Sequence, residues 1–318
     1  MTLLEIFPYI VIRIVLEMTL KLNDKNPLVS IVIINYNTAE VTIESIESII
    51  KNTVYQPYEI IIIDNASKST DRDLLSKFAS ERSFSIYLMD ENIGWNSGVN
   101  FGFDKAQGSL LLTINSDVIV EEGWLEKMVS LYLNHDNIAA VNANIYESGK
   151  SIISHEEGFL KILHGACSMI SSDAWHLVGQ LDSKNFRFYG TENDWSYRAR
   201  SMGYRLIFSE HSIVNHLGSS QITDGGGVSV RKTGKILEFL KMRLDGRVKY
   251  RIYNFKLREW LSREILSEFK HAYLNGYLKA LVATYSRVLF NLKNIFLARK
   301  ERTLKRIESL ELLSSRTK

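Results

Sequence analysis

The sequence contains few of the residues that crosslink a chain or break its regular structure. It has one cysteine, Cys167, among 318 residues, which excludes an intramolecular disulfide framework and a zinc site built from several thiolates. Three prolines and 18 glycines exclude a collagen-like, linker-dominated or low-complexity protein. The apolar N-terminus holds no uninterrupted run near the ~20 residues that span a bilayer, because Glu5, Arg13 and Glu17 interrupt it.

Residues 1–27 are predicted to form a separate N-terminal segment. Its apolar spacing favours an amphipathic helix. It lacks a positively charged start and a small-residue cleavage site, which argues against a signal peptide. A second possibility is that the protein starts at Met18 and that the earlier residues are not essential.

The charges of the chain are divided unequally between its two parts. The whole chain is 45% hydrophobic and 24% charged, which is typical of a globular protein with a large core. Residues 1–230 hold 17 basic and 28 acidic residues, whereas residues 231–318 hold 22 basic and 8 acidic ones. This imbalance favours contact of the C-terminal region with an anionic surface: a membrane, a nucleic acid or the acidic body itself.

The C-terminal region, residues 231–318, is predicted to be helical and membrane-associating. Residues 272–298 carry apolar side chains at helical spacing, interrupted by Lys279, Arg287 and Lys293. This is an amphipathic pattern, too charged to span a membrane. Because the region lacks any recognisable nucleic-acid-binding motif, we expect an anionic membrane surface as the partner and no nucleic acid.

The middle of the chain alternates between two kinds of hydrophobic pattern. Runs of β-branched and other apolar residues predict buried strands, and apolar residues at helical spacing predict helices between them. The predicted strands are 29–34, 60–63, 84–89 and 110–114, and the predicted helices are 38–51, 71–80 and 95–106. The alternation predicts an α/β domain over residues 28–230 with a mostly parallel central sheet flanked by helices.

Polar residues follow three of these predicted strands. They are the segment 35–37, Asp64 and the segment 115–117. Because ligands of such sheets bind outside the carboxyl ends of the strands, these residues predict a binding site there. Each of them alone would be an ordinary turn signal.

Several short motifs, in a fixed order, resemble those of the family 2 glycosyltransferases, which are inverting enzymes with the GT-A fold. The resemblance covers about residues 28–220. The motifs occupy residues 29–37, 60–67, 92–100, 115–117, 164–168, 178–182, 189–198, 203–204 and 214–218. The resemblance implies a nucleotide-diphosphate sugar as the donor and a glycan or lipid-linked hydroxyl group as the acceptor.

The first motifs correspond to the family's donor site. A carboxylate such as that of Asp64 can accept hydrogen bonds from a base or ribose, although it could also simply cap the next helix. The segment 92–100 combines glycines with a helix start, which favours a phosphate group. The predicted donor-binding residues are Asn35, Asn37, Asp64, Asn92, Gly94, Asn96, Asn100, Asn115 and Ser116.

The segment Asn115-Ser116-Asp117 stands where the family has an Asp-x-Asp motif. A divalent ion beside a diphosphate needs hard oxygen ligands, so Asp117 is predicted to bind Mg²⁺ or Mn²⁺. The alternative is that Asp117 caps a helix that begins before Glu121. The resemblance places His216 near the same ion, although an ordinary hydrogen-bonded imidazole is also possible.

The motif 191–194 corresponds to the place of the family's general base. Thr191 stands where the family has Glu, and the spacing to Gly203 places Glu192 at the base position and Asp194 at a later acidic position. Both therefore remain catalytic candidates, and both could instead be surface acids that open a helix. Trp195, Gly165 and Ala166 are the candidates for acceptor binding.

The resemblance implies sugar transfer with inversion, in cell-surface polysaccharide or glycoconjugate synthesis, at the cytoplasmic face of the cell membrane. The Asn-x-Asp variant is similar to rhamnosyltransferase-like members. One alternative is a sugar-nucleotide pyrophosphorylase, although the segment after the first strand has no basic residue before Lys51. Another is an inactive nucleotide-sugar-binding protein, which the departures at Asn115 and Thr191 leave open.

Overall fold

The structure is a computed structural model that describes residues 26–153, 158–186, 190–218, 254, 269–270, 278–290 and 297. The predicted N-terminal helix, Met18 and most of the predicted C-terminal region lie outside these residues. Within that region the structure describes one longer helix, α11 (Leu278–Phe290). The described residues include no helix with the length and apolar character needed to cross a membrane.

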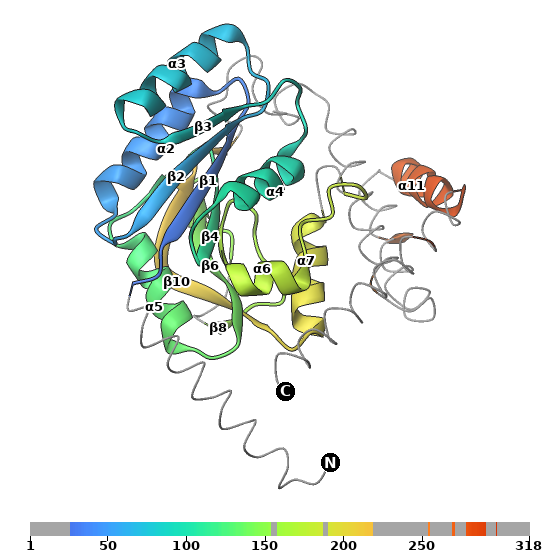
Figure 1. Cartoon of the computed structure of the whole chain (residues 1–318). Helices are drawn as coiled ribbons and strands as arrows, with labels where there is room; N and C mark the ends of the chain where they lie inside the picture. Colours follow the sequence, from blue (N-terminus) through green and yellow to red (C-terminus); the bar gives the residue numbers. More distant parts are fainter. Residues whose placement is uncertain are drawn as a thin grey trace, which may run out of the picture.

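A single mixed sheet forms the centre of the molecule (Figure 1). Its main strand order is β3-β2-β1-β4-β9-β6-β10-β5, with β7 beside β6 and β8 beside β10. The strands β3, β2, β1 and β4 are parallel, whereas β9 pairs antiparallel with both β4 and β6. The strands are β1 (Val29–Asn35), β2 (Tyr58–Asp64), β3 (Ser85–Leu88), β4 (Leu110–Asn115), β5 (Val118–Val120), β6 (Ile138–Glu147), β7 (Lys150–Ser151), β8 (Gly158–Phe159), β9 (Cys167–Ser171) and β10 (Arg205–His216).

Helices cover both faces of this sheet (Figure 1). One hydrophobic cluster packs α2, α3 and α5 against the sheet, and a second cluster packs α4, α6 and α7 against its other face. The helices are α2 (Ala39–Asn52), α3 (Ser69–Glu81), α4 (Trp95–Lys105), α5 (Trp124–Asn134), α6 (Ser172–Val178) and α7 (Thr191–Ser201). These layers confirm the predicted α/β fold.

Strand β1 shows why the apolar runs become central strands. Ile31 and Ile33 belong to the cluster on one face, whereas Val32 and Ile34 belong to the cluster on the other. Successive side chains of a strand point to opposite faces, so a strand covered on both sides needs a continuous apolar run. On the α4 side, a Cβ at Gly102 would lie 2.3 Å from a methyl group of Val32, so the glycine permits the close approach of α4.

The carboxyl ends of the parallel strands meet at one edge of the sheet. Asn35 is paired with Asp64, and Ile34 is paired with Asn115. Farther along, β6 and β10 are also parallel, with Tyr146 opposite Asn215. This register gathers the polar strand ends that the sequence predicted to form a site.

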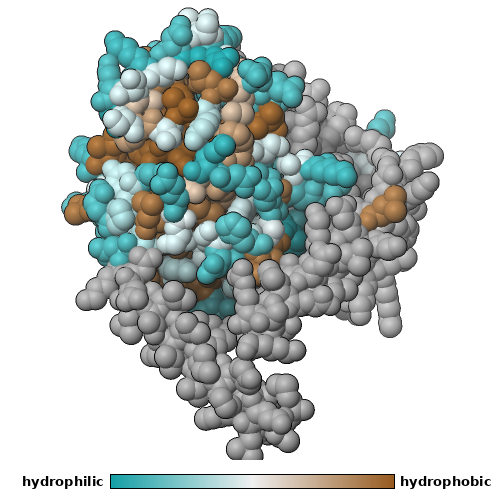
Figure 2. Space-filling model, in the orientation of Figure 1, coloured by the Kyte–Doolittle hydropathy of each residue, from teal (hydrophilic) through white to brown (hydrophobic). Residues whose placement is uncertain are grey.

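On the face shown in Figure 2, apolar and hydrophilic residues are interspersed over the described part of the molecule. The exposed large apolar side chains come from separate places in the chain, such as Val54, Leu74 and Phe159. Such scattered apolar side chains are normal for a protein surface. The prediction of membrane association therefore rests on the basic C-terminal region.

Candidate active site

Asn35 and Asp64 form a buried hydrogen-bonded cluster at the ends of β1 and β2. The Asn35 amide donates to Asp64 Oδ1 at 2.8 Å and to Ser67 Oγ at 3.0 Å, and Thr38 and Thr42 donate to its oxygen. Asp64 Oδ2 accepts from the backbone of Ser67 at 3.1 Å. Both side chains are fully buried. These contacts favour a role for Asn35 in holding the two loops over direct contact with a donor.

Asn37 and Asn92 organise the loops next to this cluster. Asn37 has a positive φ of 55°, and its oxygen accepts from the backbone of Lys68 at 2.8 Å. Asn92 Oδ1 accepts from Asn65 Nδ2 at 2.9 Å and from the backbone of Gly94 at 3.0 Å. Asn65, which the sequence analysis did not single out, also accepts from the backbone of Ile93. Its position directly after the strand-ending Asp64 is the signal that could have identified it.

Asn96 and Asn100 connect helix α4 to the segment before α7. Asn96 Nδ2 donates to the Phe186 carbonyl at 2.7 Å and to Thr191 Oγ1 at 2.8 Å. Asn100 bonds both backbone groups of Leu181, and both asparagines are buried. Direct donor contact would have to replace these bonds, so the geometry favours structural roles. Thr191, which stands where the family has Glu, is buried and has Asn96 as its hydrogen-bond partner.

Asp117 lies in the turn between β4 and β5, with Ser116 before it. The next helix, α5, begins at Trp124, so the alternative that Asp117 caps a helix before Glu121 is wrong. Asp117 Oδ1 lies 3.2 Å from His216 Nε2, and Asn115 Nδ2 lies 3.3 Å from the same nitrogen. The predicted metal-binding residues therefore come together at one place.

A further acidic residue, which belongs to none of the sequence motifs, lies at this place. Glu147, the last residue of β6, has Oε1 2.8 Å from His216 Nδ1. Burial alone lowers the pKa of His216, but hydrogen bonding and charge from Asp117 and then Glu147 outweigh it and raise the pKa to about 9. Burial, and next the charge of His216, lower the pKa of the neighbouring His164.

Within the described ranges, no group of three or more His, Cys, Asp or Glu side chains is arranged to hold a metal by itself. The donor set of Asp117 and His216 still suits an ion that takes its remaining ligands from substrate phosphates. Mg²⁺ in nucleotide enzymes is usually held in this way, by one or two carboxylates plus phosphate oxygens. The residues present therefore fit an ion that arrives with a diphosphate.

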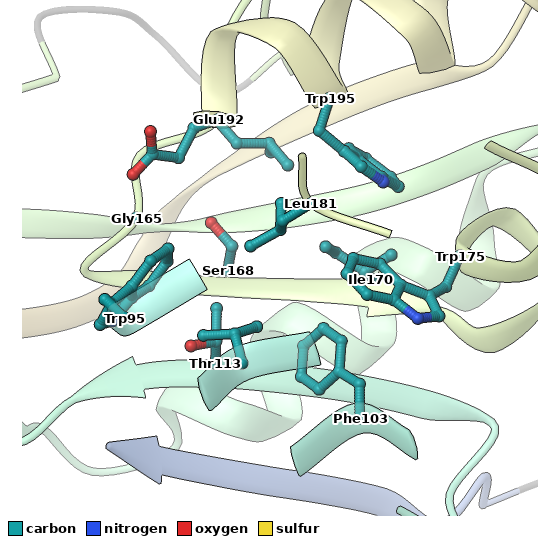
Figure 3. Close-up of a pocket in the computed structure, with 12 residues that line it drawn as sticks. Trp95, Phe103, Thr113, Gly165, Ser168, Ile170, Trp175, Leu181, Glu192 and Trp195 are labelled. Carbon is teal, nitrogen blue, oxygen red and sulfur yellow. The ribbon is translucent and has the colours of Figure 1, made fainter. Parts of the chain in front are cut away.

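Glu192 borders a largely apolar pocket between α4, α7 and the sheet (Figure 3). Its carboxylate lies against Gly165, where a Cβ would be 2.4 Å from Glu192 Oε1 and 3.4 Å from Trp95. Burial raises the pKa of Glu192, and a backbone hydrogen bond opposes part of this rise. The other pocket-lining residues are Trp95, Val99, Phe103, Thr113, Leu163, Ser168, Ile170, Trp175, Leu181 and Trp195.

Asp194 does not line this pocket. It is fully buried, with Oδ2 3.0 Å from Arg198 Nε and Oδ1 2.9 Å from Asn254 Nδ2. Arg198 also donates to the backbone carbonyls of Val178 and Gln180. The geometry therefore supports Glu192 as the base and gives Asp194 a structural ion pair.

The three predicted acceptor-binding residues occupy different positions. Gly165 lies at the Glu192 carboxylate, whereas Ala166 is buried and accepts from the Asn115 backbone at 3.0 Å. Trp195 is only 1% exposed and donates from its indole nitrogen to the Gly179 carbonyl at 2.9 Å. It also stacks on Trp175, so it forms an inner wall of the pocket. The segment 165–166 thus connects Glu192 to the candidate metal position.

Comparison with known proteins finds a glycosyltransferase family model and relatives that are named as transferases. The family model described as "Glycosyl transferase family 2" matches residues 30–199. An uncharacterized glycosyltransferase of Haemophilus influenzae is 30% identical over 118 residues, 37% of this chain and 36% of that protein. The undecaprenyl-phosphate 4-deoxy-4-formamido-L-arabinose transferase of Yersinia enterocolitica is 31% identical over 132 residues, 40% of each chain. The chain thus spans well under two thirds of the length of these curated relatives.

Solved structures of two glycosyltransferases share the fold. The mannosyltransferase PcManGT from Pyrobaculum calidifontis, in complex with GDP-Man and Mn²⁺, has a TM-score of 0.54 at 13% identity, over 89% of this chain and 87% of that one. GalNAc-T7 with UDP, GalNAc and Mn²⁺ has a TM-score of 0.55 at 16% identity, over 78% and 55%. With the ordered motifs and the matching sheet, these findings show that the chain belongs to glycosyl transferase family 2 and has the GT-A fold.

Proposed function

We propose that this chain transfers a sugar from a nucleotide-diphosphate sugar to a hydroxyl group of a glycan or lipid-linked acceptor, with inversion at the anomeric carbon. The observation that carries the proposal is the Glu192 carboxylate, which borders a pocket and has a pKa raised by burial. The segment 165–166 connects it to the cluster of Asn115, Asp117 and His216: Gly165 lies against the carboxylate, and the Ala166 carbonyl accepts from the Asn115 backbone. Direct displacement at a sugar requires a base for the acceptor and charged or polar groups for the departing diphosphate.

In the proposed reaction, Glu192 accepts the proton of the acceptor hydroxyl while that oxygen attacks the anomeric carbon. The bond from this carbon to the diphosphate breaks as the new bond forms, so the configuration inverts. A positioned base contributes ~10²–10⁴-fold in rate. Because burial has raised its pKa, Glu192 is a better proton acceptor than an exposed glutamate, provided that it is ionised.

Asp117 and His216 are the residues that would hold a divalent cation. We propose Mg²⁺ or Mn²⁺, and the solved complexes of PcManGT and GalNAc-T7 contain Mn²⁺. Such an ion supplies positive charge that stabilises the departing diphosphate. Asn37, Asn92 and Gly94 shape the loops that would receive the nucleotide part of the donor.

The proposed acceptor and location rest on one relative's name and on the charge of the C-terminal region. One relative is named as an undecaprenyl-phosphate transferase, which supports a lipid-linked acceptor and a role in cell-surface polysaccharide or glycoconjugate synthesis. The basic region 231–318 supports peripheral attachment to the inner face of the cell membrane. Flotation with anionic and neutral liposomes at low and high salt tests this part. Equal binding to both liposome types, or none, would contradict it.

The reaction itself is tested with the purified full chain and a panel of UDP-, GDP- and dTDP-sugars, each with and without Mn²⁺. We expect at least one donor to raise Tm and to release nucleoside diphosphate when acceptor is added. The anomeric configuration of the product, read by NMR, then tests inversion. Retention would refute the single-displacement mechanism. A donor that stabilises the protein without ever turning over would support the alternative of an inactive nucleotide-sugar-binding protein.

A further inference from the structure

Glu147 contacts His216, one of the predicted metal-binding residues, although it belongs to none of the motifs identified in the sequence. It ends β6, which runs parallel to β10 with Tyr146 opposite Asn215. This register brings the ends of the two strands together, so that Glu147 meets His216 across 69 positions of sequence. The contact therefore depends on the pairing of these two strands.

The imidazole of His216 has a carboxylate at each of its two nitrogens. Glu147 Oε1 lies 2.8 Å from Nδ1, and Asp117 Oδ1 lies 3.2 Å from Nε2. The His216 side chain is 16% exposed, whereas that of Glu147 is 38% exposed. The ring is thus bonded to Glu147 at Nδ1, and its other nitrogen faces Asp117 and Asn115.

A histidine that binds a metal must offer the lone pair of one ring nitrogen. Its second nitrogen then carries the proton and donates it to a carboxylate, a carbonyl group or water, which orients the ring. A carboxylate at Nδ1 therefore leaves Nε2 as the nitrogen available to a cation. Here Nε2 is the nitrogen that faces Asp117, the predicted carboxylate ligand.

We infer that Glu147 is a positioning residue for the divalent cation: it accepts the Nδ1–H bond of His216 and so directs Nε2 toward Asp117. This inference rests on the proposed function, because the cation arrives with the nucleotide diphosphate. Glu147 itself does not bind the ion, since its bonded oxygen lies at the ring nitrogen opposite the one that faces Asp117. Its effect passes entirely through His216.

The test measures Mn²⁺ binding rather than turnover. The full chain is titrated with Mn²⁺ in the presence of whichever of UDP, GDP and dTDP stabilises the wild type, and free Mn²⁺ is followed by electron paramagnetic resonance. We expect Glu147→Ala to weaken Mn²⁺ binding ~10–100-fold, the usual loss when the partner of a metal-bound histidine is removed. Glu147→Gln keeps an oxygen that can accept from Nδ1–H, so its affinity should lie closer to that of the wild type.

Glu121→Ala is the matched control. The Glu121 carboxylate accepts from Asn215 Nδ2 at 3.0 Å, next to His216 on β10, but it makes no bond to the imidazole. Its removal changes the local negative charge by the same amount as Glu147→Ala. Mn²⁺ affinity should therefore stay near the wild-type value. An equal loss in both variants would overturn the inference, because general electrostatics would then explain the effect.

A double-mutant cycle shows whether Glu147 acts through His216. In a His216→Ala background, Glu147→Ala should cause no further loss of Mn²⁺ affinity. A full additional loss would show that Glu147 binds or attracts the ion directly, which contradicts a positioning role. Wild-type Mn²⁺ affinity in Glu147→Ala would also overturn the inference while leaving the proposed function intact. If the wild type binds no Mn²⁺ with any nucleotide, both the metal part of the proposed function and this inference fail.

Discussion

The two halves of the sheet use their polar residues differently. At the ends of β1 and β2, Asn35 and Asp64 are fully buried and bonded to each other and to neighbouring loops. At the ends of β6 and β10 and the start of α7, Glu147, His216 and Glu192 are partly exposed. The pKa values of His216 and Glu192 are also shifted there. This difference indicates a structural frame at the ends of β1 and β2 and a candidate reactive surface at the ends of β6 and β10.

The largest expected effect is the loss of kcat when Glu192, the proposed base, is replaced. Glu192→Gln keeps the size of the side chain but removes its basic charge, so kcat should fall ~10²-fold or more with donor affinity nearly unchanged. Steady-state kinetics at saturating donor and Mn²⁺ measure this.

Asp194→Asn is the comparison variant, because it lies two residues away on the same helix. It weakens the ion pair with Arg198 and should mainly lower the free energy of unfolding. If Asp194→Asn abolishes turnover in folded protein while Glu192→Gln is mild, Asp194 is the base and our assignment is reversed.

The second-largest effect is a loss of stability when the buried cluster around Asn35 is disrupted. Asn35→Ala removes the hydrogen bonds that the Asn35 side chain makes to Asp64, Ser67, Thr38 and Thr42. An orphaned buried polar group costs about 1–3 kcal/mol, so the midpoint of urea denaturation should fall clearly. The kcat of the remaining folded protein should change far less than in Glu192→Gln. A normal midpoint with a large loss of donor affinity would show that Asn35 contacts the donor directly.

A smaller effect concerns the contact between Gly165 and the carboxylate of Glu192. An added methyl group in Gly165→Ala would lie 2.4 Å from Glu192 Oε1, so the flexible carboxylate must move. We expect kcat to fall on the order of 10-fold, because misplacing a reacting group costs rate, while Tm changes little. Unchanged kcat in Gly165→Ala would remove this contact from the mechanism.

The smallest expected effect is a pH-dependent change in Tm that follows from the shifted pKa of Glu192. Burial raises the pKa of Glu192 above its ordinary 4.5, so its contribution to stability is present below pH 4.5 and is lost as pH rises through the folded-state pKa. Glu192→Gln has no such loss. Its Tm should therefore exceed that of the wild type at pH 8, by a shift on the order of 1–3 °C, with a smaller difference at pH 4. Calorimetry at both values checks the sign, and a lower Tm at pH 8 would contradict it.

The strands and helices near the start of the domain were predictable because their signals are local. The observed β1, β2, α4 and β4 lie within two residues of the predicted ranges. Their apolar runs and helical spacings reflect burial against neighbouring layers. The short strands β5, β8 and β9 were not predicted, since their runs depend on pairing with strands far away in the sequence.

The order of the motifs was enough to determine the family, and the residue types at the strand ends predicted a region for the site. Only the tertiary structure distinguished Glu192, at a pocket, from Asp194, paired with Arg198 and with Asn254, 60 positions away. It alone revealed Glu147 beside His216. The physical reason is that burial, pKa and hydrogen-bond partners depend on contacts between distant segments, whereas periodicity and motif spacing are local properties of the chain.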